Sequence, residues 1–204
     1  MTETVRTADA ALTVAREQRA VTGRALAADA RPISRACLAV ARRFRAGGTL
    51  LTFGAGESCT DAQHIAVEFL HPVIVGKRAL PAIALPNDAA TMTGFATAGH
   101  PEAAFAHALR QLARPGDIAL GVASDAGDPA LREALRAARD LGLLTVALLD
   151  TPQQDPPDVD HVLWARSGDP RVVKESHVTI YHILWELVHV LLDQPGVLDA
   201  EDVT

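Results

Sequence analysis

The sequence predicts a three-layer α/β/α sandwich built on a five-stranded parallel sheet. Short apolar runs alternate with longer segments of helical periodicity, and glycine or proline separates most of them. Strands joined by single helices form parallel sheets with right-handed crossovers, and the helices then cover both faces. We therefore expect one domain over residues 1–204, with N-terminal helices at 1–48 and an α/β core at 49–192.

The composition excludes several classes of protein. The 204 residues, 49% hydrophobic and 22% charged, suffice for one core and are not typical of a disordered chain. A formal charge of −6 without a Lys/Arg stripe argues against nucleic acid as a partner. We also expect no membrane association, because no long apolar stretch or apolar leader is present. With only Cys37 and Cys59, no disulfide framework is indicated, so we expect a cytoplasmic protein.

The first 48 residues carry two helical patterns. Residues 8–28 are rich in alanine, leucine and arginine at helical spacing. Pro32 starts a second helix, which ends at Gly47 and Gly48. The first of these helices has no evident partner within the chain, which favours packing against a second copy.

Strands and helices then alternate along the core. Asp128 as N-cap and Pro129 at the first helical position are a strong helix start, and Gly142 ends that helix. Ligands of such folds bind at the carboxyl ends of the strands, so we expect the chemistry in the loops that follow them. We expect strands at 49–53, 80–85, 118–122, 143–149 and 159–165, the last at a sheet edge, and helices at 59–70, from Asp88, and at 102–113, 129–141 and 171–192.

A glycine-containing turn, Gly54 to Ser58, joins the first strand to its helix. Such a turn directs backbone N–H groups and the positive helix end at a ligand, which suits an anion. Ser58 is expected as N-cap or as a hydroxyl that contacts phosphate. Within the helix, His64 and Glu68 are four residues apart and share one face, with His71 three further on. The pair suits acid/base or ligand chemistry, and the alternative is a hydrogen-bonded surface pair.

These motifs together resemble the phosphoheptose isomerases of the sugar isomerase (SIS) domain family. The likeness extends over about residues 8–192 and is most specific in the DAxHxAxE pattern that begins at Asp61. It rests on Gly54-Ala55-Gly56-Glu57-Ser58, Asp61 to Glu68, Leu80 to Leu85 with Asp88, Arg114 to Asp117, and Glu175, His177 and His182.

The resemblance implies an enzyme that interconverts a ketose phosphate and an aldose phosphate through an enediol. It implies a homo-oligomer, usually a tetramer, with active sites lined by more than one subunit. Glu68 would be the base and His182 its acid partner, and His64, Glu68 and His182 would be three ligands of a zinc ion. The substrate-binding residues implied on this basis are Gly56, Ser58, Asp88, Ser124, Arg171 and Lys174.

Several positions depart from the family pattern. Lys174 stands where the family has a glutamine metal ligand, and a protonated ammonium repels a cation. In the loop after the third strand, Asp125 and Asp128 replace hydroxyl residues, so a phosphate there would meet negative charge. Arg171 replaces an aspartate. We therefore expect Arg171 and Lys174 to supply compensating positive charge to an altered substrate site.

Two other functions and several plainer roles remain alternatives. The two other functions are a non-catalytic sugar-binding or protein-interaction regulator of this fold and the partner subunit of an active paralogue. For Asp128 we favour helix capping. His177 has two interpretations, a site residue or a subunit contact. His71, Trp185 and His189 are expected to be structural, packed or solvent-facing.

Overall fold

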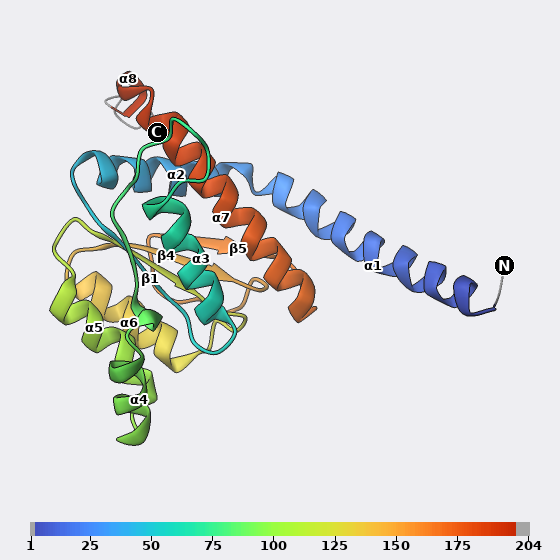
Figure 1. Cartoon of the computed structure of the whole chain (residues 1–204), viewed down its shortest axis with the longest axis horizontal. Coiled ribbons are helices and arrows are strands. Elements are labelled where there is room, and N and C mark those ends of the chain that lie inside the picture. The colour runs from blue at the N-terminus through green and yellow to red at the C-terminus, as the bar shows by residue number, and fades with distance from the viewer. Residues whose placement is uncertain (1–2, 199–204) are drawn as a thin grey trace.

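The computed structural model describes residues 3–198 and has the expected α/β/α architecture (Figure 1). All four pairs of neighbouring strands are parallel, and the strand order is β2-β1-β3-β4-β5. This confirms the predicted fold class and the edge position of the last strand. The strands are β1 (Leu50–Phe53), β2 (Ala82–Ala84), β3 (Ile118–Val122), β4 (Leu144–Leu149) and β5 (His161–Trp164).

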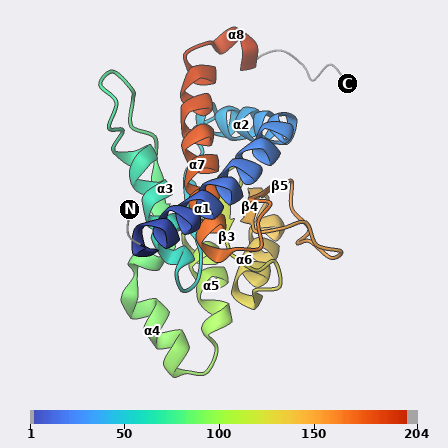
Figure 2. The same ribbon diagram turned by 90° about the vertical axis from the view of Figure 1, so that its right-hand side faces the viewer.

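The helices divide into two layers around this sheet (Figure 2). One face carries α2, α3 and α7, and the other carries α5 and α6. The helices are α1 (Glu3–Ala28), α2 (Ala30–Arg45), α3 (Ser58–Leu70), α4 (Ala89–Thr97), α5 (Ala104–Leu112), α6 (Pro129–Asp140), α7 (Pro170–Leu192) and α8 (Pro195–Leu198), with short 3-10 turns η1 (Leu85–Asn87) and η2 (Pro101–Ala103).

Helices cover both faces of the sheet, whose central strands consist mainly of apolar residues. In β1, Leu50 contributes to the core under α2, α3 and α7, whereas Leu51 contributes to the core under α5 and α6. Every residue of β1, β3 and β4 is buried. Such strands are typical of parallel sheets covered by helices on both sides.

The chain leaves the adjacent strands β1 and β3 toward opposite faces of the sheet. After β1 it enters α3 on one face, and after β3 it enters α6 on the other. This is a topological switch point, where ligands of open α/β sheets bind. The loops at residues 54–57 and 123–128 therefore flank the expected site.

Several predicted boundaries differ from the structure, three of them with consequences for local geometry. The N-cap role of Ser58 is wrong, because Glu57 is the cap position and Ser58 is the first residue of α3. Glu57 is itself helical, with φ −67° and ψ −27°, and the N–H of Ser58 donates to the carbonyl oxygen of Ala55 at 3.1 Å. The chain thus winds into α3 through a tight turn. β2 is shorter than expected because Leu85 already begins η1, and α1 begins earlier, at Glu3.

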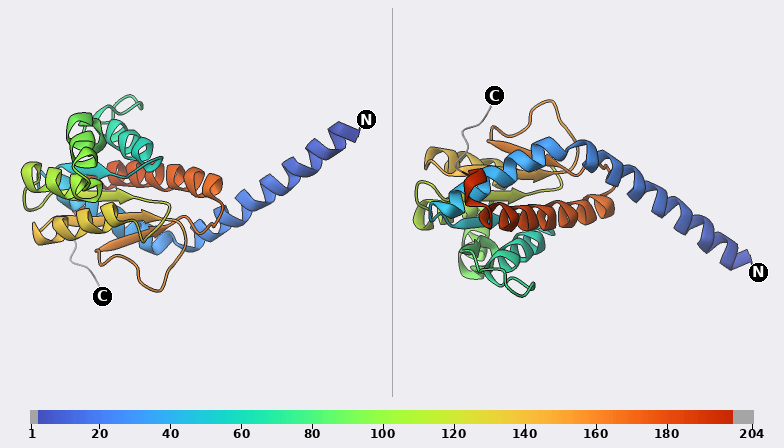
Figure 3. Two further views of the ribbon diagram at one scale, coloured as in Figure 1. Left: turned by 90° about the horizontal axis from the view of Figure 1, so that it is seen from below. Right: turned by 90° about the horizontal axis from the view of Figure 1, so that it is seen from above.

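Helix α1 extends well beyond the sandwich (Figure 3). Of its side chains, those of Thr22 and Leu26, near its carboxyl end, are buried. Several apolar side chains along the rest of the helix are exposed: Val5, Leu12, Val14 and Val21. Within residues 3–198, no helix combines the length and apolar character needed to cross a bilayer.

Candidate active site

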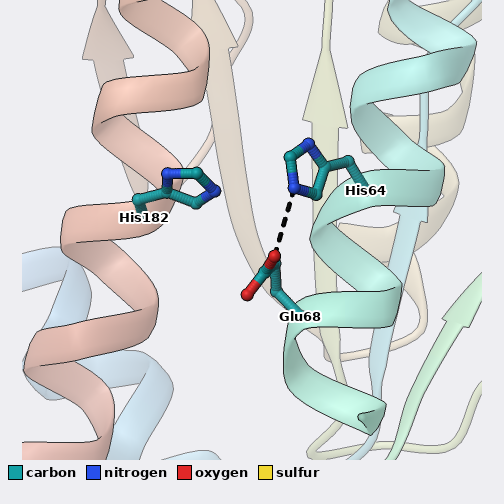
Figure 4. A group of neighbouring side chains, drawn as sticks. All are labelled: His64, Glu68 and His182. Carbon is teal, nitrogen blue, oxygen red and sulfur yellow. Dashed lines mark hydrogen bonds and ion pairs between the residues drawn. The ribbon is translucent and has the colours of Figure 1, made fainter. Parts of the chain in front are cut away.

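Two helices that are distant in sequence place three potential ligands side by side. His64 and Glu68 project from α3, and His182 projects toward them from α7 (Figure 4). Nε2 of His64 lies 3.1 Å from Oε1 of Glu68, and the ring centroids of His64 and His182 are 5.2 Å apart. The structure therefore brings the carboxylate of Glu68 and the imidazole of His182, which are far apart in the sequence, into one cluster.

The position of Glu68 is fixed by packing between the same two helices. The indole Nε1 of Trp185 on α7 donates a hydrogen bond of 2.8 Å to the backbone carbonyl of Glu68. Trp185 is buried, so this bond fixes α7 against α3 at the level of the cluster. One turn further on, His189 is buried, with Nδ1 lying 2.9 Å from the carbonyl oxygen of Trp185 and Nε2 lying 3.2 Å from that of Arg78. Trp185 and His189 are thus structural, as expected.

The donor atoms of the cluster suit a divalent metal ion. One ligand atom from each of His64, Glu68 and His182 lies within 4.8 Å of the others. Ligands of a tetrahedral zinc ion lie about 3.4 Å from one another, so a small movement of the exposed His182 side chain suffices. Two imidazole nitrogens and a carboxylate oxygen are also the ligand types of catalytic zinc sites that keep an open position.

Tyr181 is a member of the site that the sequence analysis missed. Its hydroxyl oxygen lies 2.7 Å from Nδ1 of His64, and its ring contacts the rings of His64 and His182 edge-on. A signal was present in the sequence, because Lys174, His177, Tyr181 and Trp185 recur at spacings of three and four. That periodicity marks one face of α7, and this face packs on α3.

Lys174 is directed away from the cluster, toward the first turn of α3. Its Nζ donates to the carbonyl oxygen of Glu57 (2.9 Å), to Oγ1 of Thr60 (2.7 Å) and to Oδ2 of Asp61 (2.6 Å). All three ammonium protons therefore have acceptors. The Asp61 side chain is only 3% exposed, so this ion pair is partly inside the protein. The ammonium group of Lys174 thus lies beside the turn after β1.

His177 lies between this ion pair and the end of β4. It is 2% exposed, and its Nε2 has no hydrogen-bond partner among the described residues. Burial lowers the pKa of His177, with a smaller contribution from Lys174, against opposing effects from a backbone hydrogen bond at Leu149 and from the charge of Asp61. Burial thus favours a neutral imidazole. The structure does not place His177 within the group formed by His64, Glu68 and His182.

The turn after β1 requires its glycines. A Cβ at Gly54 would lie 2.7 Å from the carbonyl oxygen of Val122, and Gly56 has φ +57°. Both line a cavity of about 760 Å³ at the carboxyl ends of β1, β2 and β3. This cavity is mainly apolar and includes none of the cluster's three side chains. The cluster combines two imidazoles with a carboxylate, whereas the cavity is lined by the acidic residues Glu102 and Asp128 and by no histidine.

In the loop after β3, both carboxylates bind backbone donors of their own segment. Oδ1 of Asp125 accepts from the N–H of Gly127 at 2.8 Å, and Oδ1 of Asp128 accepts from the N–H of Leu131 at 2.9 Å. The capping role of Asp128 is thus confirmed. Two backbone donors that could bind a phosphate, those of Gly127 and Leu131, are thus already occupied, whereas the neighbouring Ser124 is exposed.

Two other expected substrate-binding residues also make local contacts. Asp88 is exposed and caps α4, accepting from the N–H and the hydroxyl of Thr91. These hydrogen bonds lower the pKa of Asp88. Arg171 forms a two-pronged ion pair with Asp169, and its side chain is 80% exposed. The bond to Arg171 lowers the pKa of Asp169 to about 2.

Comparison with known proteins identifies the family. The SIS domain model matches residues 15–150. The chain belongs to the SIS domain family. It is 35% identical over 163 residues to a phosphoheptose isomerase of Crocosphaera subtropica, covering 79% of this chain and 83% of that protein. A phosphoheptose isomerase of Roseiflexus sp. is 37% identical, with coverage of 73% and 76%.

Solved structures in this SIS family share the architecture. A phosphoheptose isomerase from Francisella tularensis superposes with a TM-score of 0.80 at 25% identity, covering 93% of this chain and all of that one. One from Neisseria gonorrhoeae has the same TM-score at 20% identity, covering 88% and 97%. The predicted SIS fold is thus confirmed.

Proposed function

We propose that the chain is a sugar-phosphate isomerase of the phosphoheptose isomerase type, with Glu68 and His182 as its acid/base pair. The proposal is carried by the convergence of His64, Glu68 and His182 from two distant helices. Membership of the SIS domain family and the identity to named phosphoheptose isomerases support it. We do not favour a non-catalytic regulator, because its function would not require this cluster.

Each side chain of the cluster has a chemical role in such a reaction. Oε1 of Glu68 is bonded to His64, so the other carboxylate oxygen is free to move a proton between adjacent sugar carbons. His182 is exposed and can protonate a sugar oxygen. His64, Glu68 and His182 would hold a zinc ion, which supplies Lewis-acid polarisation of the carbonyl group when bound.

The loops at the carboxyl ends of the strands would bind the rest of the substrate. We assign this role to Gly56 and Ser58 after β1, Asp88 after β2 and Ser124 after β3. Because Asp125 and Asp128 occupy donors after β3, we place the phosphate nearer the first turn of α3. There the N-terminal end of α3 provides positive charge, and we assign Lys174, whose ammonium protons are bound by Glu57, Thr60 and Asp61, an electrostatic role without direct contact to the phosphate.

We also assign Arg171 to binding of the phosphate, and the variant Arg171→Ala tests this assignment. The guanidinium is exposed and held by Asp169, so its loss should leave the fold unchanged. We expect KM for sedoheptulose 7-phosphate to rise about 10-fold, with kcat nearly unchanged, because an exposed charge of this kind contributes to binding in both ground and transition states. Steady-state kinetics measure this. A KM equal to that of the unaltered protein would remove Arg171 from the site.

We also propose a homo-oligomer, a dimer or a tetramer. The support is the exposed apolar side chains along α1, which extends beyond the sandwich (Figure 1). Light scattering coupled to size-exclusion chromatography measures the mass of the assembly. A monomer at micromolar concentration would contradict this part of the proposal.

The central test combines an activity assay with metal analysis. The purified protein is incubated with sedoheptulose 7-phosphate, with and without added zinc, and aldose products are measured. We expect turnover and about one zinc ion per chain. No turnover under any metal condition, together with the absence of bound metal, would overturn the proposed enzyme and favour a binding module.

A further inference from the structure

Tyr181 is the only tyrosine in the chain, and its hydroxyl meets the candidate metal cluster from α7. The side chain is buried at 1% exposure, one residue before His182. It makes no contact that the acid/base chemistry above requires. Its position therefore needs a separate explanation.

The tyrosine hydroxyl completes the polar contacts of the His64 ring. Nδ1 lies 2.7 Å from the hydroxyl, and Nε2 lies 3.1 Å from Oε1 of Glu68. Both ring nitrogens are thus engaged, which fixes the rotation of the imidazole. The buried tyrosine ring also contacts the rings of His64 and His182 with centroid separations of 5.1 Å. The orientation of His64 is therefore held by a rigid neighbour.

A phenol can accommodate both hydrogen-bonding states of the imidazole. Without a metal, His64 donates from Nε2 to Glu68, and its Nδ1 accepts from the tyrosine hydroxyl. With Nε2 bound to a metal, Nδ1 carries the proton and donates to the phenolic oxygen. The hydroxyl of Tyr181 lies 2.7 Å from Nδ1, so it can serve as donor in the first state and as acceptor in the second.

We propose that Tyr181 is a positioning residue, whose hydroxyl orients Nε2 of His64 toward Glu68 and His182 and thereby strengthens binding of a divalent metal ion. The inference rests on the proposed metal site. Outer partners of metal-bound histidines are commonly worth a factor of about 10 to 100 in metal affinity. Removing this hydroxyl should have an effect of that size.

The test is calorimetric titration of the full chain with zinc chloride after chelator treatment. Tyr181→Phe keeps the ring and removes only the hydroxyl. Ser176→Ala is the matched control, because it removes another buried hydroxyl from α7, one that donates to the carbonyl oxygen of Val172. Glu68→Gln replaces a proposed carboxylate ligand with a neutral and weaker amide oxygen. We expect zinc affinity to fall at least 10-fold in Tyr181→Phe and to stay within twofold in Ser176→Ala.

The outcomes separate this inference from the proposed site. If Glu68→Gln weakens zinc binding but Tyr181→Phe does not, the role of Tyr181 is overturned and the metal site stands. If the unaltered chain binds no zinc, the proposed metal site and the role of Tyr181 in metal binding are both overturned.

A metal-free measurement gives a second readout. In nitrogen-15 NMR spectra at alkaline pH, where imidazoles are neutral, the unaltered His64 should carry its proton on Nε2. In Tyr181→Phe the proton should stay on Nε2, which Glu68 binds, but the Nδ1 resonance should shift, because Nδ1 loses its hydrogen-bond donor. An unchanged ring spectrum in a folded Tyr181→Phe protein would also overturn the inference.

Discussion

Glu68→Gln should lower kcat for sugar-phosphate isomerisation by about 1,000-fold, while the protein keeps its fold. General acid/base groups contribute factors of about 100 to 10,000, and an amide cannot take up the proton. The glutamine oxygen can still accept the hydrogen bond from Nε2 of His64, which is 3.1 Å away in the native protein. The loss of kcat should therefore come from the missing proton acceptor and not from a displaced His64 side chain. Steady-state kinetics measure kcat, and circular dichroism checks the fold.

Glu186→Gln is the matched control for this experiment. Glu186 lies on α7, four residues after His182, and it is exposed. Replacing this glutamate by glutamine should leave kcat within twofold of the native value. Zinc content is measured for both variants, so that loss of metal and loss of the proton acceptor can be distinguished. A Glu68→Gln enzyme with more than a tenth of the native kcat would exclude Glu68 as the base.

The fold was predictable because its signals are local. Apolar runs such as Leu144–Leu149 are bounded by glycine or proline, and the Asp128-Pro129 start of α6 lies where the capping rules place it. Errors arose where backbone geometry depends on a neighbouring turn. Ser58 has the side chain of a good N-cap, but the turn at Gly56 brings Glu57 into the helical region first.

The site was only partly predictable, because it joins two helices. Helical spacing alone places His64 beside Glu68. No spacing rule places His182 there, since that contact depends on how α7 packs on α3; it was expected only from the family resemblance. The contacts of Tyr181 and Lys174 depend on the same packing. A tyrosine and a lysine at regular spacing in a helix do not reveal which side chains they will meet.

The ion pair between Lys174 and Asp61 should make a larger contribution to stability than the surface ion pairs of the same helix. The side chain of Asp61 is 3% exposed and that of Lys174 is 35% exposed. Lys174→Met leaves the Asp61 carboxylate buried without its charged partner. Breaking buried pairs costs about 3–5 kcal/mol, and the partial exposure of the lysine reduces this to about 2 kcal/mol. Urea denaturation measures the free energy of unfolding.

Arg19→Met is the matched control, because Arg19 also pairs with a residue of α7. That pair, with Glu175, is 41% and 51% exposed and should contribute less than about 0.5 kcal/mol. In the double variant Lys174→Met with Asp61→Asn, no unpaired charge remains, so it should be more stable than Lys174→Met alone. If Lys174→Met and Arg19→Met lowered the free energy of unfolding equally, the larger contribution expected of the buried pair would be contradicted. If the expected order is found, the lysine that departs from the family's metal ligand has a structural role, joining α7 to the first turn of the helix that carries His64 and Glu68.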